Sequence, residues 1–145
     1  KGLVDWKYNK KFVELGNLYS TRDWGHASDY MDAMIKMILL KNPGDYIVST
    51  GKEYDVKTFV NKTLKLLDIK FKWKNTGLKE VCVDLDDNLI IKINKKFFRP
   101  AEVNHLKGSS KKFRDLTGWK PKYNFEKLVE DMVYYELDKK SRNFK

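Results

Sequence analysis

The chain is organised around a hexapeptide that lies between a short apolar strand and a long amphipathic helix. It reads Thr21-Arg22-Asp23-Trp24-Gly25-His26. At such a strand-to-helix junction, backbone N–H groups and the helix dipole favour an anion. Together with the arginine and the histidine, this position predicts a functional loop that holds a phosphate. The alternative is structural, because neighbouring Arg and Asp side chains often form an ion pair that only stabilises a loop.

Four helices are predicted on the C-terminal side of this loop, because apolar residues recur there every three or four positions. They span residues 27–40, 55–68, 110–116 and 124 onward. Asp55, Ser110 and Asn124 are expected to be the N-caps of the last three, since short side-chain oxygens accept hydrogen bonds from the first turn of a helix. From residue 139 the composition turns polar and basic, which predicts a frayed end.

Short strands are predicted at residues 12–15, 45–50, 71–73 and 89–93 from their apolar and β-branched content. The last two are expected to pair as a hairpin across a polar segment, residues 74–88. Within that segment Asp84, Asp86 and Asp87 resemble a sparse calcium loop, but the glycine and the final glutamate of such a loop are missing, so we expect turn residues. Residues 1–11 fit either a frayed helix or a lead-in to the first strand.

Length and composition predict one domain of 145 residues with a real core and a net charge of +10. That charge suits nucleic acid, a membrane surface or an anionic metabolite. The lysines are scattered and form no arginine-rich run, so we interpret most of them as a solvated surface and expect no nucleic acid or membrane partner. A basic nucleic-acid binder remains the less favoured alternative.

The expected compartment is the cytoplasm. A single cysteine, Cys82, cannot form an internal disulfide, and its apolar neighbours predict a buried or half-buried thiol in a reducing environment. The sequence contains no apolar run near the roughly 20 residues of a membrane span and no signal-peptide pattern. It also begins without methionine and contains no glycine-rich dinucleotide fingerprint after a strand, which suggests a piece of a longer protein.

Four ordered blocks of the sequence closely resemble the GDP-mannose 4,6-dehydratase family, sugar-nucleotide enzymes of the extended short-chain dehydrogenase/reductase type. The blocks are Leu15-Gly16-Asn17-Leu18 through Arg22-Asp23-Trp24-Gly25-His26, Asp45-Tyr46-Ile47-Val48 through Thr50-Gly51, Phe98-Arg99-Pro100 with Glu102-Val103, and Leu116 through Gly118-Trp119-Lys120-Pro121. The resemblance runs from about residue 12 to residue 137 and so covers nearly the whole chain.

The resemblance implies an α/β fold: the C-terminal substrate-binding lobe of an extended short-chain dehydrogenase/reductase, with a small mixed sheet and about four helices. Residues 1–145 would form this single lobe, and the N-terminal Rossmann domain that binds NADP would be missing. The family enzyme converts GDP-mannose to GDP-4-keto-6-deoxymannose, the first step of GDP-fucose and deoxyhexose synthesis. Its Thr, Glu and Tyr-x-x-x-Lys set belongs to the missing half. We therefore expect no catalytic residue in this chain, an inactive lobe on its own, and a homo-oligomer at full length.

The resemblance also assigns a substrate site of five residues. Arg22 and Arg99 would clamp the diphosphate, which agrees with the planar fork of donors that an arginine offers to phosphate oxygens. Glu102 would accept hydrogen bonds from the ribose hydroxyls. Gly16 and Asn17 would lie near the guanine, where a side-chain amide can read a base edge.

Each assignment has a structural alternative. Glu102 can simply pair with Arg99, Asn17 can be a turn residue, and His26 can be a hydrogen-bonding group at the start of a helix. One departure from the family pattern is Gly108-Ser109, where the family usually has Gly-Asp before its short helix. Serine can still accept the hydrogen bonds of the helix start, so we expect a change in local stability rather than in ligand binding. At the level of function, a catalytically inert nucleotide-sugar binding module is the main alternative.

Overall fold

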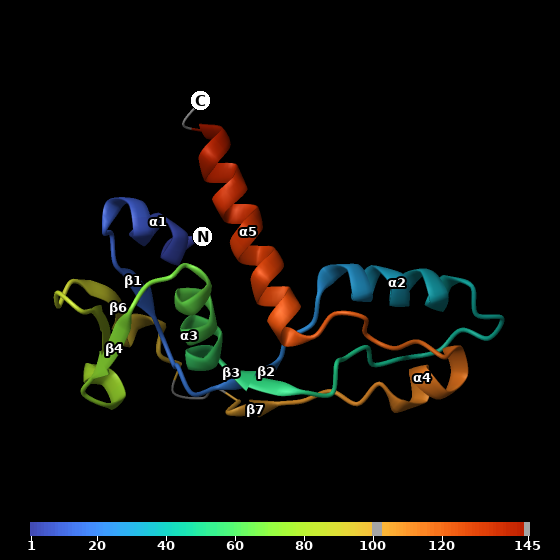
Figure 1. Ribbon diagram of the computed structural model, residues 1–145. Helices are drawn as coiled ribbons and strands as arrows, with labels where there is room; N and C mark the ends of the chain where they lie inside the picture. Colours follow the sequence, from blue (N-terminus) through green and yellow to red (C-terminus); the bar gives the residue numbers. More distant parts are fainter. Residues whose placement is uncertain (100–102, 144–145) are drawn as a thin grey trace.

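The computed structural model describes residues 1–99 and 103–143. Two small mixed sheets and five α-helices make up this part of the chain (Figure 1). The expected α/β class is confirmed. Glu102 lies outside the described residues, and its role stays a prediction.

The larger sheet has four strands in the order β1-β6-β5-β4. These are β1 (Val13–Leu15), β4 (Phe71–Lys74), β5 (Val81–Asp84) and β6 (Leu89–Ile93). β1 is parallel to β6, and the other pairs are antiparallel. The predicted hairpin between the third and fourth expected strands is therefore wrong, because β5 lies between them. The sequence signal for β5 was the apolar run Val81-Cys82-Val83, short enough to be lost within polar residues.

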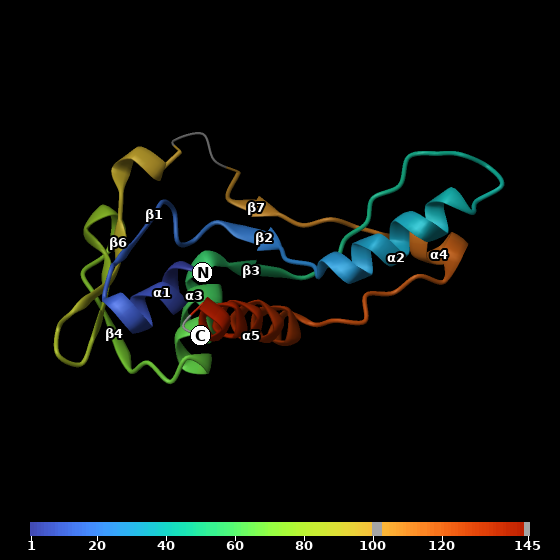
Figure 2. The ribbon, with the colours of Figure 1, turned by 90° about the horizontal axis from the view of Figure 1, so that it is seen from above.

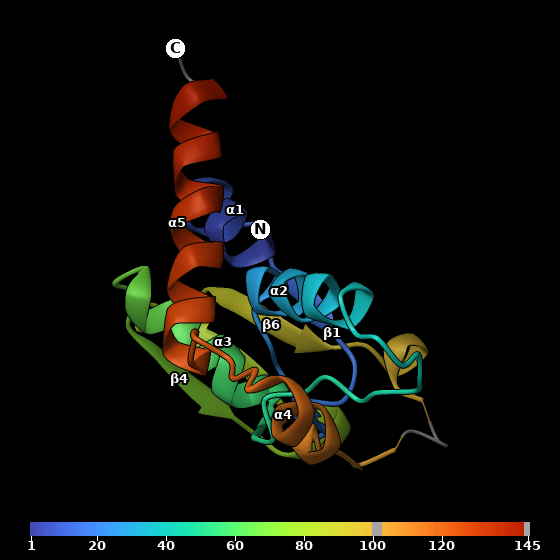
Figure 3. The same cartoon turned by 90° about the vertical axis from the view of Figure 1, so that its right-hand side faces the viewer.

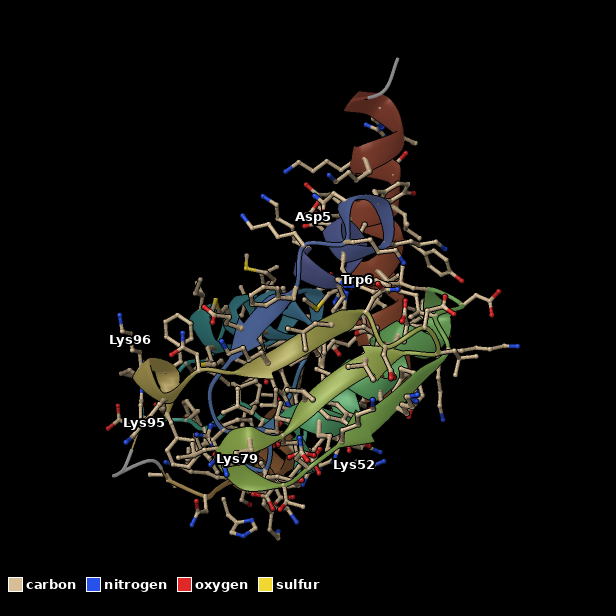
Figure 4. The ribbon with its side chains drawn as sticks, turned by 90° about the vertical axis from the view of Figure 1, so that its left-hand side faces the viewer. Asp5, Trp6, Lys52, Lys79, Lys95 and Lys96 are labelled. Atoms are coloured by element: carbon tan, nitrogen blue, oxygen red, sulfur yellow. The ribbon has the colours of Figure 1, made fainter. Side chains whose placement is uncertain are left out.

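Three helices pack beside this sheet: α1 (Gly2–Asn9), α3 (Val56–Leu66) and α5 (Phe125–Asn143). One core cluster joins α1 and α3 to the strands and consists of Trp6, Val60, Leu64, Cys82, Ile90 and Ile91. A second joins α1 and α5 and includes Val4, Leu128, Val129 and Val133. Figure 4 shows Trp6 between α1 and the strands, where its indole nitrogen donates to the Leu89 carbonyl at 2.7 Å. Residues 1–11, left open by the sequence, thus form a helix that closes the core.

The smaller sheet has three strands in the order β3-β2-β7. β2 (Thr21–Asp23) is antiparallel to β3 (Glu53–Asp55) and parallel to β7 (His105–Leu106). The hexapeptide Thr21 to His26, which was predicted to be a loop, is therefore a strand over its first three residues. Seen from above, this sheet bridges the compact region around α3 and α5 and an arm that carries α2 and α4 (Figure 2).

The arm consists of α2 (Ala27–Ile38), α4 (Lys111–Thr117) and the coil between α2 and β3. Its core is small: Ala33, Phe113 and Trp119, with partly buried neighbours such as Met37 and Val48. Figure 3 shows α2 above α4 in front of the sheets, with both helices away from the upper half of α5.

The predicted strand at residues 45–50 is wrong, since this segment belongs to neither sheet. Side chains, rather than a neighbouring strand, bind part of its backbone. The Ser110 hydroxyl donates to the Ser49 carbonyl at 2.9 Å, and the Asp23 carboxylate accepts from the Thr50 N–H at 2.9 Å. Residues with strand propensity form a ladder only where a partner strand lies beside them.

The predicted helices are confirmed with small changes at their ends. Asp55 caps α3 by accepting from the Thr58 N–H at 2.5 Å, and Asn124 accepts from the Lys127 N–H at 2.8 Å at the start of α5. Ser110 stands at the N-cap of α4, but its side chain makes no cap hydrogen bond because it donates to Ser49 instead. The predicted fraying from residue 139 is also wrong, since α5 continues to Asn143.

Candidate functional site

The turn after β1 holds two of the predicted substrate residues. Gly16 is required there, because a Cβ atom at this position would lie 2.2 Å from the Phe97 carbonyl oxygen. The Asn94 N–H donates to the Leu15 carbonyl at 2.8 Å and fixes the same contact. The end of β1 therefore lies directly against residues 94–97, which include the short 3-10 helix η2 (Lys95–Phe97).

Asn17 is a turn residue, as its structural alternative stated. Its Oδ1 accepts from the Tyr19 N–H at 2.9 Å, which is the bond of an Asx turn. This bond uses the oxygen, and the Nδ2 group is the part of the amide that can donate to a ligand. A role in reading guanine therefore stays a prediction for the amide nitrogen.

Arg22 connects the N-terminal part of the predicted site, which contains Gly16 and Asn17, with the segment that follows Arg99. It lies on β2, and its Nη1 donates to the carbonyls of Thr21 at 2.7 Å and Val103 at 2.8 Å. Arg22 and Val103 are 81 positions apart in sequence. The parallel pairing of β2 with β7, in which Arg22 faces Leu106, continues the contact. The guanidinium is thereby held at the edge where the segment after η2 returns to the sheet.

Arg99 is exposed and follows η2 by two residues. The structure thus brings Gly16 and Asn17 beside residues 94–97, and Arg22 beside Val103, with Arg99 on the segment between these two contacts. We call this region the rim: residues 15–22, 94–99 and 103–106. Figure 4 shows Lys95 and Lys96 extending from the rim into solvent, so its surroundings are positively charged.

Asp23 stabilises the turn that precedes β3. Its carboxylate accepts three hydrogen bonds, from the Thr50 N–H at 2.9 Å, the Thr50 hydroxyl at 2.6 Å and the Gly51 N–H at 2.8 Å. Side chains of successive strand residues point to opposite faces, so Asp23 and Arg22 face different partners. Asp23 is therefore a structural residue of the hexapeptide.

His26 is the N-cap of α2, as its structural alternative stated. Its Nδ1 accepts from the Ser28 N–H at 3.2 Å, and its ring stacks on Tyr123 with 4.1 Å between centroids. The first turn of α2 carries the buried Asp29, whose carboxylate accepts from the N–H groups of Lys122 at 3.0 Å and Tyr123 at 3.1 Å. The N–H groups of Ser28 and Asp29 are bonded to His26 at the start of this helix. The phosphate role of the hexapeptide stays a prediction.

A buried polar cluster beside the rim was not predicted from the sequence. Glu80 is only 2% exposed and accepts from the Tyr19 hydroxyl at 2.8 Å and from Lys57 Nζ at 2.6 Å. Burial by itself lowers the pKa of Lys57, but the hydrogen bonds to Glu80 and Tyr19 outweigh it and raise the pKa. The Lys57 N–H also donates to the Leu18 carbonyl at 2.9 Å, which anchors the turn of Asn17 on α3.

Cys82 is confirmed as a buried thiol with 0% exposure. Burial raises its pKa to about 12, so the thiolate needed for nucleophilic chemistry is scarce at neutral pH.

The turn interpretation of Asp84 is also confirmed, since its Oδ1 accepts from the N–H groups of Asp86 at 3.1 Å and Asn88 at 2.8 Å.

Two cavities lie away from the rim. One of about 160 Å³ lies between Trp24, Tyr54 and the segment before α5, and one of about 360 Å³ lies between His26 and α5. Neither is lined by Gly16, Asn17, Arg22 or Arg99. Residues 95–99 and 103–106 of the rim are exposed, so a ligand has access to them from solvent. Within residues 1–99 and 103–143, no helix is both long enough and apolar enough to cross a membrane.

Comparison with known proteins places the chain in a family. Residues 4–132 match the family model described as GDP-mannose 4,6 dehydratase. A GDP-mannose 4,6 dehydratase of Drosophila melanogaster is 40% identical over 139 residues, which cover 94% of this chain and 35% of the relative. GDP-mannose 4,6 dehydratase 1 of Arabidopsis thaliana is 40% identical over 86% of this chain and 30% of the relative. The chain therefore spans about a third of the length of these curated relatives.

Solved structures show the same fold at lower sequence identity. RMD from Pseudomonas aeruginosa, complexed with NADPH, matches with a TM-score of 0.69 and 18% identity over 92% of this chain and 38% of that one. A dTDP-glucose 4,6-dehydratase from Bacillus anthracis, in complex with NAD, matches with a TM-score of 0.68 and 19% identity over 94% of this chain and 37% of that one. The family model matches residues 4–132 of this chain, and the curated relatives are 40% identical to it. The chain therefore belongs to the GDP-mannose 4,6-dehydratase family.

Proposed function

We propose that this chain is the substrate-binding part of a GDP-mannose 4,6-dehydratase, a lyase that converts GDP-mannose to GDP-4-keto-6-deoxymannose. The observation that carries the proposal is the rim. Arg22 and Val103 are 81 positions apart in sequence, yet the Arg22 guanidinium binds the Val103 carbonyl directly. Arg99 and Glu102 lie on the segment that leads to Val103. A diphosphate that lies along this edge meets one arginine from each half.

In this proposal four residues of the rim and Glu102 bind the substrate. Arg22 and Arg99 pair with the diphosphate oxygens, because a guanidinium offers parallel donors that match two oxygens at once. Glu102 accepts hydrogen bonds from the ribose hydroxyls. The Asn17 amide nitrogen donates to the guanine edge, and Gly16 lets the turn approach residues 94–97 closely. These residues bind and orient the substrate, and the chain contributes no proton or hydride transfer of its own.

The NADP chemistry belongs to the part of a family-length protein that this chain does not include. The sequence has no glycine-rich fingerprint between a strand and a helix, so its residues do not fit a dinucleotide. The chain alone is therefore expected to be inactive. NADP would supply the hydride acceptor and donor for the reaction, in the cytoplasm, within a homo-oligomeric full-length enzyme.

The exposed face of α2 supports the proposal that a further domain packs on this lobe. α2 buries Ala33 but leaves a second apolar stripe in solvent. The stripe consists of Met31 (56% exposed), Met34 (52%), Ile35 (55%) and Ile38 (81%). Large exposed apolar patches mark protein interfaces, and an NADP-binding domain that covers this stripe would bury it.

Calorimetry with GDP tests the proposal. We expect the chain to bind GDP weakly, because an open rim supplies only part of the contacts. Arg99→Ala is expected to weaken binding by about 1.5–3 kcal/mol, the usual worth of a charged hydrogen bond. Lys96→Ala is the matched control, since it removes the same charge three residues away and leaves the guanidinium in place.

Equal losses in the two variants would show that only bulk charge attracts the ligand, and no GDP binding by the unmodified chain would refute the substrate site. Arg22→Lys is a stricter variant in a full-length enzyme. Lysine keeps the charge but cannot reproduce both the carbonyl contacts of Nη1 and a planar pair of donors. We therefore expect GDP-mannose dehydration to fall, and near-normal turnover and KM would make Arg22 a scaffold residue.

A further inference from the structure

Tyr19 has an unusual combination of rigidity and exposure. Its neighbours Leu18 and Ser20 are both 2% exposed and fix the backbone, yet Tyr19 itself is 53% exposed. Two hydrogen bonds fix the residue, one from its backbone and one from its side chain. The backbone N–H donates to Asn17 Oδ1 at 2.9 Å, and the hydroxyl donates to the Glu80 carboxylate at 2.8 Å.

The partners of the hydroxyl are the buried Glu80 and the partly buried Lys57. Glu80 accepts from both Tyr19 and Lys57, so its charge is compensated inside the fold. Lys57 Nζ lies 5.3 Å from the centroid of the Tyr19 ring and 4.6 Å from that of Trp73. A structure that only needed to close a turn would not require a half-exposed aromatic ring anchored by a buried carboxylate.

We propose that the Tyr19 ring is a stacking surface for the base of the bound nucleotide. The inference rests on the proposed function and adds a recognition residue to it. Tyr19 belongs to the same turn as Asn17, the residue assigned to the base edge, so a base read by the Asn17 amide lies within reach of the ring. A ring that is already immobilised loses little conformational entropy when a base stacks on it.

The division of labour between the two residues follows from their chemistry. Stacking tolerates any base, because every base has a π-face, whereas an amide distinguishes base edges by hydrogen bonds. Tyr19 therefore contributes affinity for nucleotides in general, and Asn17 contributes the choice among them. Glu80 is a positioning residue in this account, since it acts on the ligand only through the tyrosine.

Nuclear magnetic resonance titrations with GDP, ADP and inorganic diphosphate test the inference on the 145-residue chain. Stacking shifts the purine H8 resonance upfield in the complex with the unmodified chain. We expect Tyr19→Ala to abolish this shift and to weaken GDP and ADP binding by about five- to a hundredfold. Diphosphate binding is expected to stay unchanged, because the arginines remain.

Three further variants complete the test. Tyr19→Leu fills a similar space without a π-system, so it repeats the loss if Tyr19→Ala folds poorly. Tyr19→Phe and Glu80→Gln keep the ring but weaken its anchor, and we expect a smaller loss of GDP affinity with the upfield shift retained. Tyr134→Ala, which removes a tyrosine that is 56% exposed on α5, is the matched control and is expected to change nothing.

The outcomes separate the inference from the proposed function. Unchanged GDP affinity and an unchanged H8 shift in Tyr19→Ala or Tyr19→Leu would overturn the stacking role and leave the substrate site intact. Equal losses of GDP and diphosphate binding would also overturn it, because they would indicate a collapsed rim. Failure of the unmodified chain to bind GDP at all would overturn both proposals.

Discussion

The compact region and the arm differ in how completely they bury their apolar residues. α1, α3, α5 and the four-stranded sheet share two core clusters with twelve buried members. The arm has a cluster of three buried residues and leaves the apolar stripe of α2 in solvent. The compact region therefore buries its apolar side chains within this chain, whereas the arm leaves an apolar face of α2 exposed. We propose above that a further domain packs on that face.

Replacing a buried residue of the compact region and a residue of the exposed α2 stripe is expected to show the largest difference. Trp6 is 2% exposed and donates to the Leu89 carbonyl, so Trp6→Ala should lower the free energy of unfolding by about 3–5 kcal/mol. Ile38 on α2 is 81% exposed, and Ile38→Ala should change it by less than about 0.5 kcal/mol. Urea denaturation of both variants measures these values. Similar losses would show that the arm is packed as firmly as the compact region.

Asp29 joins α2 to the chain before α5, and its loss is expected to loosen the arm without unfolding the compact region. Asp29→Ala removes the acceptor of the Lys122 and Tyr123 N–H groups and should cost about 1–3 kcal/mol for each donor left unpaired. Amide hydrogen exchange should accelerate in α2 and α4 before it does in α3. Uniform acceleration across the chain would contradict two regions of unequal stability.

The smallest effect concerns acid stability of the compact region. Burial acts to raise the pKa of Asp84, but hydrogen bonds from Asn88 and Asp86 outweigh it and lower the pKa. A lowered pKa in the folded state gives stability that is present above the unfolded value of about 3.9 and is lost as the pH falls through the folded value.

Asp84→Asn keeps an acceptor and removes this titration. Its melting temperature should therefore fall less than that of the unmodified chain between about pH 6 and about pH 2. Asp138→Asn, which removes an exposed carboxylate from α5, is the control for charge alone. Identical pH profiles for the unmodified chain and Asp84→Asn would contradict the role of Asp84.

Sequence patterns were sufficient to predict the elements that have a local apolar periodicity and a capping residue. α2, α3 and α5 have an apolar face with 3.6-residue periodicity, and Asp55 and Asn124 mark the starts of the last two. Residues 45–50 also have a strand pattern, but a strand forms only beside a partner, and the sequence of one segment does not say whether the partner is present. The sequence prediction missed β5 for the opposite reason. Its apolar run is short, but it pairs with β4 on one side and with β6 on the other.

The candidate site was predictable to a similar degree. The family motifs identify Gly16, Asn17 and Arg22, but only the fold shows that Arg22 binds the Val103 carbonyl. The cluster around Glu80 had no motif, since Tyr19 and Glu80 are 61 positions apart in sequence and meet only in the folded chain. Contacts of this kind depend on tertiary packing and leave no local pattern.

We propose that a nucleotide binds at the rim. Backbone amide shifts of the chain, recorded during a titration with GDP, test it most directly because they report every region at once. We predict that the shifts concentrate in residues 15–22, 94–99 and 103–106, and that α2 and α5 change little. Shifts confined to the cavity between His26 and α5, or to the exposed stripe of α2, would contradict the account.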